Sequence, residues 1–346
     1  MSVVKKIQLK NIRIHDDFIA DFSPNITIIQ GKNGTGKTSI IEAIYIALQG
    51  SSFKGSDNSV LKQDKPWWSL DIEMLDNQKR KISYDPDKIS GKKQFNIDDK
   101  KSYRLNPTNH YPVVLFEPDD LRLLNGSPTR RRQFIDGFIA QLNPQYKTIV
   151  NRYEKALKQR NNLLKRGNVV NDDLFAWDIS LSDYGSYIIE QRIMFIEKIN
   201  DQLNEYYNRI AKSKDIISVH YSNTFIGDIK HKLLRDLQQN TERDKIVGFT
   251  SIGPHRHDVI FQYNNSPALQ VASRGEVRSI VLALKLLEVG IIEQITNNKP
   301  IILLDDVFSE LDEDRQKNLH LPDTQIIITS TTIPKGLDKN IKIINL

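Results

Sequence analysis

The first 120 residues alternate short apolar runs with polar turns, a spacing typical of β-strands. Each run is rich in β-branched and aromatic residues, and Asp, Asn, Pro or Gly separates it from the next. One interval differs, because apolar residues after Gly36 recur at helical spacing up to a stop at Gly50. The predicted helix covers residues 37–50, and the predicted strands are residues 5–14, 25–30, 67–75, 80–85 and 111–116.

Between residues 121 and 247 the period of the apolar residues becomes helical. Apolar residues line one face of each of several successive predicted helices, which indicates helices that pack together. The pattern lacks the sustained heptads of a long coiled coil, so we predict a small helical bundle. A single strand candidate, residues 215–221, interrupts them. The predicted helices cover residues 134–142, 149–164, 188–210 and 229–237.

Strand patterns return near the end of the chain, at residues 257–263, 299–306 and 324–331, around an apolar helix over 271–288. These strands are too few to form a sheet of their own, so we expect them to join the first strands. The expected fold is therefore α/β, with a helical arm inserted in a head domain. The predicted head is residues 1–120 with 248–346, and the predicted arm is residues 121–247.

Composition narrows the class of protein. The chain has 346 residues, of which 39% are apolar, enough to bury a core. It has no cysteine, which excludes disulfides, zinc–thiolate sites and thiol nucleophiles. The best membrane candidate, residues 280–292, is broken by Lys285 and Glu288. We expect a soluble, cytoplasmic protein.

Positive charge is concentrated in one segment. The formal net charge is +6, yet residues 121–170 contain eleven Lys or Arg and two acidic residues. Such a run is either a solvated helix face or a surface for nucleic-acid phosphates, and charge alone does not decide between them. The candidate DNA contacts are Arg130, Arg131, Arg132, Arg152, Lys155, Lys158 and Arg160.

A phosphate-binding loop is the strongest motif. Residues 31–38 read GKNGTGKT, which matches G-x-x-x-x-G-K-[ST] between a strand and a helix. Glycines let successive amides point at phosphate oxygens, Lys37 neutralises the outer phosphates, and Thr38 offers its hydroxyl to Mg²⁺. A turn without ligand is the weaker alternative. The predicted ATP-binding residues are Gly31, Lys32, Asn33, Gly34, Thr35, Gly36, Lys37 and Thr38.

Two carboxylates follow a buried strand. The run IILLDD ends in Asp305 and Asp306, where such a strand leaves the core. We expect Asp305 to hold Mg²⁺ through water and Asp306 to orient or deprotonate the attacking water. The alternative for either residue is a cap on the next turn, and it has more weight for Asp306.

Ser273-Arg274-Gly275-Glu276 opens the apolar helix of residues 271–288. Ser273 and Glu276 have the spacing of a capping box, in which each side chain binds the other residue's amide. Along the chain, a G-x-N-G-x-G-K-T loop comes first, this segment second, and a strand that ends in acids third. The same order is typical of ABC-type ATPases, which this chain therefore resembles. In that class, a Ser-x-Gly-Gln-like signature of one subunit closes over the γ-phosphate held by the other.

Within the ABC type, the chain resembles the bacterial RecF family of recombinational repair proteins. The stretches that carry the resemblance span residues 31–312, and LKNIRIHDDF near the N-terminus is a looser match. They are GKNGTGKTSIIEAIY, VVLFEPDDLRLLNGSPTRRRQFID, YEKALKQRNNLLK, TSIGPHRHDVIF, SRGEVRSIVLALKL and IILLDDVFSELD.

The resemblance implies an ATPase head like those of Rad50 and the SMC proteins, with a short helical arm. It also implies ATP-dependent dimerisation, binding to duplex or gapped DNA, and loading of RecA with the partners RecO and RecR. By position, Ser273 and Gly275 act across the dimer, and residues 309–312 touch the partner subunit.

Two positions depart from the family pattern. Glu276 stands where the family usually has glutamine, and its charge would weaken closure unless the carboxylate points back at its own amide. His257 follows GPHR where the family usually has an acid, so this motif is either a turn leading into a strand or a nucleotide contact.

Other function classes share this nucleotide chemistry. A transport ATPase subunit would need a surface for membrane helices, which the basic segment argues against. A nuclease with the same head would need a further cluster of acids or histidines. We therefore expect an ATP-gated DNA-binding protein.

Overall fold

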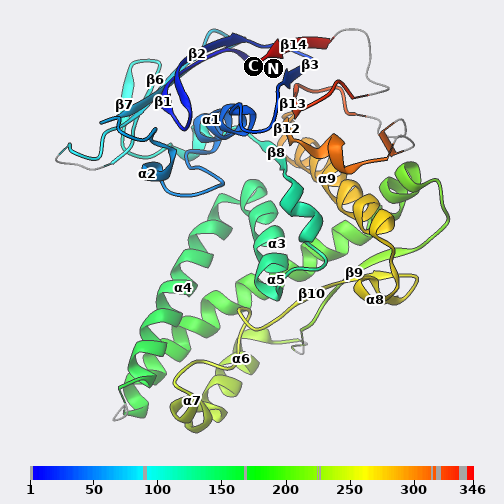
Figure 1. The fold of residues 1–346 in the computed structure, drawn as a ribbon. Helices are drawn as coiled ribbons and strands as arrows, with labels where there is room; N and C mark the ends of the chain where they lie inside the picture. The colour runs from blue at the N-terminus through cyan, green and yellow to red at the C-terminus, as the bar shows by residue number, and fades with distance from the viewer. Residues whose placement is uncertain are drawn as a thin grey trace. The chain divides into compact units, whose positions relative to one another are not determined.

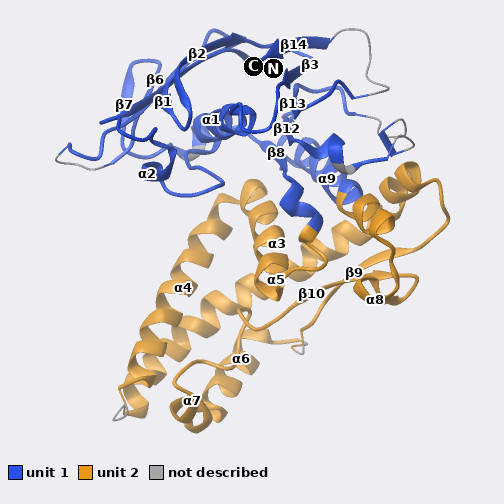
Figure 2. Ribbon diagram, viewed as in Figure 1, with its two compact units in different colours: residues 1–121, 282–346 blue, residues 122–281 orange. Residues whose placement is uncertain are grey.

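The computed structural model describes residues 3–88, 92–166, 170–223, 225, 227–312, 315–316, 321–334 and 341–346. The chain forms two compact units, shown in Figure 2. Unit 1 contains residues 1–121 and 282–346, and unit 2 contains residues 122–281. The second boundary is at 281/282 rather than at the expected 247/248, because the strand at 259–263 pairs with a strand of the helical unit.

Unit 1 contains a five-stranded parallel sheet in the order β14-β3-β13-β12-β8. Its strands come from both ends of the chain, as the split domain requires. Every residue of β12 and β13 is buried, which explains the apolar runs IILL and III with which they begin. The strands are β3 (Ile26–Gln30), β8 (Val113–Phe116), β12 (Ile301–Asp305), β13 (Ile326–Ser330) and β14 (Ile341–Asn345).

A six-stranded antiparallel sheet completes unit 1, in the order β2-β1-β4-β5-β6-β7. Helix α1 (Lys37–Gln49) contacts strands of both sheets and is buried along most of its length. Gly50 ends it with a left-handed φ of 82°. The strands are β1 (Val4–Ile12), β2 (His15–Asp21), β4 (Trp68–Met74), β5 (Lys79–Tyr84), β6 (Gln94–Ile97) and β7 (Lys100–Ser102). The short helix α2 (Asp57–Val60) precedes β4 in the chain.

Four of these strands, β2, β6, β7 and β14, were not predicted. In β2, which reads HDDFIAD, only Ala20 is buried, and every residue of β7 is exposed. Strands at or near a sheet edge need little apolar alternation, because backbone pairing alone defines them. Three short 3₁₀ turns also connect elements: η1 (Pro107–Asn109), η2 (Pro118–Arg122) and η3 (Val307–Glu310).

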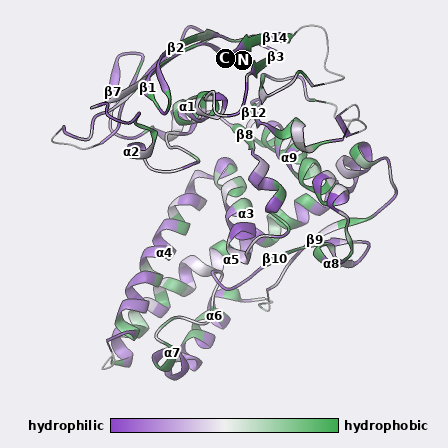
Figure 3. Ribbon diagram, viewed as in Figure 1, coloured by the Kyte–Doolittle hydropathy of each residue, from purple (hydrophilic) through white to green (hydrophobic). Residues whose placement is uncertain are grey.

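Unit 2 is mainly helical (Figure 1). Hydrophobic and hydrophilic residues alternate along α4, as Figure 3 shows, so one face packs inward and the other meets solvent. Helix α5 begins 17 residues before the predicted start at 188. The sequence did not indicate this first part, because Phe175 and Ile179 are apolar but exposed and disturb the helical spacing of apolar residues. The helices are α3 (Pro128–Leu142), α4 (Pro144–Leu164), α5 (Asn171–Ala211), α6 (Ile229–Gln239) and α7 (Thr241–Val247).

A three-stranded sheet, β11-β10-β9, lies in unit 2. Its strands are β9 (Ile217–Tyr221), β10 (Val259–Tyr263) and β11 (Ser266–Pro267), and helix α8 (Ala268–Val271) follows. Helix α9 (Arg274–Thr296) begins in unit 2 and continues in unit 1. In the described part of the chain, no helix is both long and apolar enough to cross a membrane.

Candidate nucleotide-binding site

The phosphate-binding loop lies between β3 and α1 in unit 1. Gly34 and Gly36 have left-handed φ values of 85° and 88°, a conformation that favours glycine. At Gly36 a β-carbon would lie 2.4 Å from His15 Nε2 and 2.8 Å from the Ile14 side chain. The chain therefore requires glycine at this position for both backbone conformation and space.

Lys37 lies at the start of α1 and is 7% exposed. Its Nζ donates to the carbonyl oxygens of Gly31 (2.7 Å) and Lys32 (3.0 Å), so the ammonium group is held against the loop. The Thr35 hydroxyl also donates to the Lys32 carbonyl, at 2.9 Å. A buried cation beside a helix N-terminus is suited to triphosphate oxygens, so the loop fits ATP.

Thr38 and Asp305 meet at the carboxyl edge of the parallel sheet. The Thr38 hydroxyl donates to Asp305 Oδ1 at 2.8 Å, although the residues are 267 positions apart. Thr329 on β13 donates to the same oxygen at 2.8 Å. The hydroxyl and carboxylate therefore present adjacent oxygen ligands of the kind Mg²⁺ prefers, and the residues fit that ion.

Asp306 immediately follows β12, with a left-handed φ of 53°. Its backbone N–H donates to the Thr329 hydroxyl at 2.9 Å. Thr329 thus binds the carboxylate of one acid and the backbone of the next, and it is fully buried. A non-glycine residue in this conformation costs energy and is common at functional sites.

Two further charged residues near Asp305 were missed by the sequence analysis. Lys54 Nζ lies 3.8 Å from Asp305 Oδ2. Glu117 follows β8, which pairs in parallel with β12. Burial, and next the Asp120 carboxylate, raise the pKa of Glu117 to about 7; Lys54 opposes this shift and Asp305 adds to it. The rule that found Asp305, an acid after a buried strand, also fits Glu117, whereas no sequence signal pointed to Lys54.

The segment Ser273–Glu276 lies in unit 2, at the start of α9. The Ser273 N–H donates to Glu276 Oε2 at 2.6 Å, and the Glu276 N–H donates to Ser273 Oγ at 3.3 Å. This is the predicted capping box. The Glu276 carboxylate points back at its own helix start, which is the condition under which its charge does not oppose phosphate binding.

The candidate DNA contacts divide into exposed and buried residues. Arg152, Lys155 and Lys158 lie on the exposed face of α4, spaced three residues apart. Arg130 and Arg132 on α3 are half-buried. Arg132 donates to the His257 carbonyl at 2.7 Å and to Thr129 Oγ1 at 2.9 Å. The exposed face of α4 is the part of the basic segment that fits a phosphate backbone.

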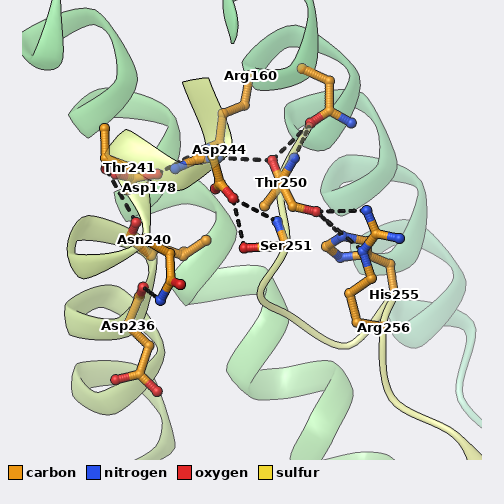
Figure 4. A network of polar contacts seen from close by, with 12 residues as sticks. Arg160, Asp178, Asp236, Asn240, Thr241, Asp244, Thr250, Ser251, His255 and Arg256 are labelled. Atoms are coloured by element: carbon orange, nitrogen blue, oxygen red, sulfur yellow. Dashed lines mark hydrogen bonds and ion pairs between the residues drawn. The ribbon is translucent and has the colours of Figure 1, made fainter. Parts of the chain in front are cut away.

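The prediction that Arg160 contacts DNA is wrong, because its side chain is fully buried. Figure 4 shows it within a polar network of unit 2. Its guanidinium donates to Asp178 Oδ1 (2.6 Å), to Asp244 Oδ2 (2.7 Å) and to the Thr250 hydroxyl (3.0 Å). Arg160 therefore holds α4 to α5 and α7.

The prediction that Arg131 contacts DNA is also wrong, because this residue is buried, with only 8% of it exposed. It donates to both carboxylate oxygens of Asp258, at 2.9 and 2.7 Å, and to the carbonyls of Leu124 and Gly126. These bonds occupy its guanidinium and join α3 to the strand start at β10.

The GPHRH motif is a structural element of unit 2. His255 Nδ1 lies 2.7 Å from Tyr153 OH, and His257 Nδ1 lies 2.8 Å from Tyr221 OH. Burial lowers the pKa of each histidine to about 4, so both are neutral at pH 7. These contacts favour the turn interpretation over the nucleotide contact.

Comparisons with known proteins agree with this geometry. Residues 6–319 match the family model described as "AAA domain". The chain is 36% identical to the DNA replication and repair protein RecF of Streptococcus agalactiae serotype V, over 99% of this chain and 96% of the relative. It is 34% identical to the same protein of Clostridium perfringens strain SM101, over 98% and 97% respectively.

Solved structures give the same assignment. The structure of the recombination mediator protein RecF-ATPrS in the RecFOR pathway matches with a TM-score of 0.87 and 28% identity, over 97% of this chain and 94% of that one. The SmcHead bound to the C-winged helix domain of ScpA matches with a TM-score of 0.55 and 14% identity, over 95% and 90%, and shows the shared ATPase-head fold alone. This chain therefore belongs to the RecF family of DNA replication and repair proteins.

Proposed function

We propose that this chain is an ATP-dependent DNA-binding protein of recombinational repair and replication-fork maintenance in the cytoplasm. ATP joins two copies, which bind duplex or gapped DNA with little sequence preference and help RecO and RecR to load RecA. Slow, DNA-dependent hydrolysis then resets binding. The observation that carries the proposal is the 2.8 Å bond between Thr38 and Asp305 beside a complete phosphate-binding loop.

In this proposal the loop residues bind and orient the triphosphate. Backbone amides from Gly31 to Gly36 bind phosphate oxygens, and Lys37 exchanges its bonds to loop carbonyls for bonds to phosphate. Mg²⁺, when bound, would neutralise charge on the phosphate oxygens. Thr38 and Asp305 would hold it, and Asp306 would orient or deprotonate the attacking water.

The second copy supplies the rest of the site. Ser273 and Gly275 of one copy bind the triphosphate held by the other, as the family resemblance implies. The exposure of Ser273 supports this role, because a ligand can reach its hydroxyl hydrogen, which otherwise bonds to the Glu276 carboxylate. That hydrogen can be donated to a phosphate oxygen.

DNA is bound through its phosphates in this proposal. Arg152, Lys155 and Lys158 support it, since they present positive charge on one exposed helix face. Arg130 and Arg132 remain further candidates. Contacts of this kind have little sequence preference, and affinity falls steeply with salt.

The test is the molar mass of the protein in solution, measured by light scattering without nucleotide, with ADP and with ATP, each with and without gapped DNA. We expect a dimer with ATP only, and retention of DNA by that dimer. Lys37→Ala should abolish both responses, whereas Lys6→Ala, an exposed lysine of β1, should change neither. Asp306→Asn should prolong the ATP-bound dimer. ATP-independent DNA binding by Lys37→Ala and wild type alike would contradict the gating proposal.

A further inference from the structure

The Glu276 carboxylate has a second donor besides its own helix start. Tyr263, the last residue of β10, donates its hydroxyl hydrogen to Glu276 Oε1 at 3.0 Å. The other oxygen, Oε2, accepts from the Ser273 N–H at 2.6 Å. Each carboxylate oxygen is therefore committed to a different part of unit 2.

Tyr263 is itself firmly placed. It is 8% exposed, and its ring packs edge-on against Tyr207 of α5, with centroids 6.4 Å apart and an interplanar angle of 81°. β10 pairs with β9 from Tyr263↔Ile217 to Val259↔Tyr221. Strand pairing with β9 and ring packing against α5 therefore fix the position of the hydroxyl that donates to Glu276.

The loop after Tyr263 is also tied to the segment between α5 and β9. Asn264 Nδ2 donates to Asp215 Oδ1 at 2.9 Å, and Asn264 Oδ1 accepts from the Ile216 N–H at 2.9 Å. Hydrogen bonds from Asn264 and next from Tyr263 lower the pKa of Asp215. Because the Tyr263 hydroxyl has a single hydrogen, Asp215 is a second acceptor for it beside Glu276.

A carboxylate suits these two donors better than an amide would. Glutamate offers two acceptor oxygens, whereas glutamine offers one acceptor and two donor hydrogens. With glutamine, the side-chain oxygen could accept from the Ser273 N–H, but the NH₂ group would have to donate to the Tyr263 oxygen. The two bonds to a charged carboxylate would thus become weaker neutral bonds. The bond from the Ser273 N–H, the largest influence, also lowers the pKa of Glu276, so the carboxylate is ionised at neutral pH.

We propose that Glu276 and Tyr263 form a latch that holds Ser273 and Gly275 in the conformation that meets the triphosphate of a second copy. Both are positioning residues: neither needs to touch ATP. The latch connects the start of α9 to β10 and α5, and both of its donors direct the negative charge of Glu276 toward unit 2 itself. Its role in dimerisation rests on the proposed function, whereas its role in ordering the loop does not.

The first experiment measures the latch alone, by hydrogen exchange of residues 272–277 in the full chain without nucleotide. Tyr263→Phe removes the hydroxyl but keeps the ring against Tyr207. We expect the Ser273 and Glu276 amides to exchange about fivefold to tenfold faster, the loss expected for one hydrogen bond of ordinary strength. Tyr187→Phe is the matched control, because it removes a hydroxyl that accepts from Asn143 Nδ2 elsewhere in unit 2.

The second experiment measures the dimer dissociation constant with a non-hydrolysable ATP analogue. Tyr263→Phe should weaken the dimer about fivefold to tenfold while leaving nucleotide affinity of the isolated chain unchanged. Glu276→Gln should weaken it similarly, and the double variant should be no weaker than the weaker single variant, since both changes break one latch. Tyr187→Phe should dimerise like the wild type.

The outcomes separate the latch from the proposed function. Unchanged exchange at residues 272–277 in Tyr263→Phe would overturn the latch. Tighter dimerisation of Glu276→Gln would also overturn it, because Glu276 would then act as a repulsive charge. If the wild type formed no dimer with the ATP analogue, the proposed function would fail, and the exchange result would still decide whether the latch exists.

Discussion

Replacing Arg160 with methionine tests whether the buried arginine of α4 serves stability rather than DNA. Methionine keeps most of the length of the side chain but removes its charge, so Asp178 and Asp244 lose their shared cation. Both carboxylates are almost fully buried, with 3% and 0% of their side chains exposed. Breaking a buried ion pair by removing one partner costs about 3–5 kcal/mol, because an uncompensated charge is left inside.

The measurement is the free energy of opening of α4 and α5, followed by hydrogen exchange of the slowest amides. Lys158→Met is the matched control, since it makes the same type of change two residues away on the exposed face of α4. We expect Lys158→Met to change stability by less than about 0.5 kcal/mol. It should instead lower DNA affinity and reduce the slope of log affinity against log salt by about 0.9.

The pH dependence gives an internal check on Arg160→Met. Burial already raises the pKa of Asp178 in the presence of Arg160, and removal of the cation would raise it further. A carboxyl with a raised folded pKa favours the native state below its unfolded pKa and loses that contribution as pH rises. The deficit relative to wild type should therefore shrink as pH falls toward 4. Wild-type stability of Arg160→Met at pH 7 would refute the reasoning.

Two further predictions concern glycine and histidine. Gly36→Ala should destroy nucleotide binding and cost about 1–3 kcal/mol of stability, because φ is 88° and the new β-carbon would collide with His15. Gly137→Ala is the matched control in the middle of α3, where a β-carbon meets no other atom. It should stabilise the chain by about 0.5–1 kcal/mol, because alanine favours a helix more than glycine does. Both can be checked by thermal unfolding and fluorescent-nucleotide titration. Acid should destabilise unit 2, because His255 and His257 have folded pKa values of about 4 against an ordinary 6.5. The unfolded chain binds their protons first, so stability is complete above about pH 6.5 and falls toward pH 4, by about 2 kcal/mol per histidine at pH 5. Equal stability at pH 7 and pH 5 in a denaturant titration would exclude this.

The phosphate-binding loop could be predicted from sequence because its chemistry is local. Eight consecutive residues contain the glycines, the lysine and the threonine, and the flanking patterns identify the strand and helix. Asp305 could be predicted because an acid after a buried strand must lie at the sheet edge. Thr329 could not, because a threonine within an apolar strand has the same pattern whether it packs or donates to an acid.

The buried arginines show a second limit. Arg160 lies in a run of basic residues whose sequence is typical of an exposed surface. Its burial depends on ion pairs with Asp178, 18 positions away, and Asp244, 84 positions away. No local spacing reveals a partner at that separation. The edge strand β2 is a similar case, since only its pairing with β1 makes HDDFIAD a strand. Tertiary partners therefore decided what local patterns could not.

The order of the parallel sheet has a consequence for biosynthesis. β3, which leads into the phosphate-binding loop, is flanked in its sheet by β13 and β14, the last two strands of the chain. A ribosome that has just made β3 must therefore add about 300 residues before either neighbour exists, at roughly 5–20 residues per second. During that interval the apolar strand has no sheet partner, and contacts of such long sequence separation form slowly. The proposed nucleotide-binding loop can therefore reach its final packing only after β13 and β14 have been made, so truncation that removes these strands should weaken ATP binding.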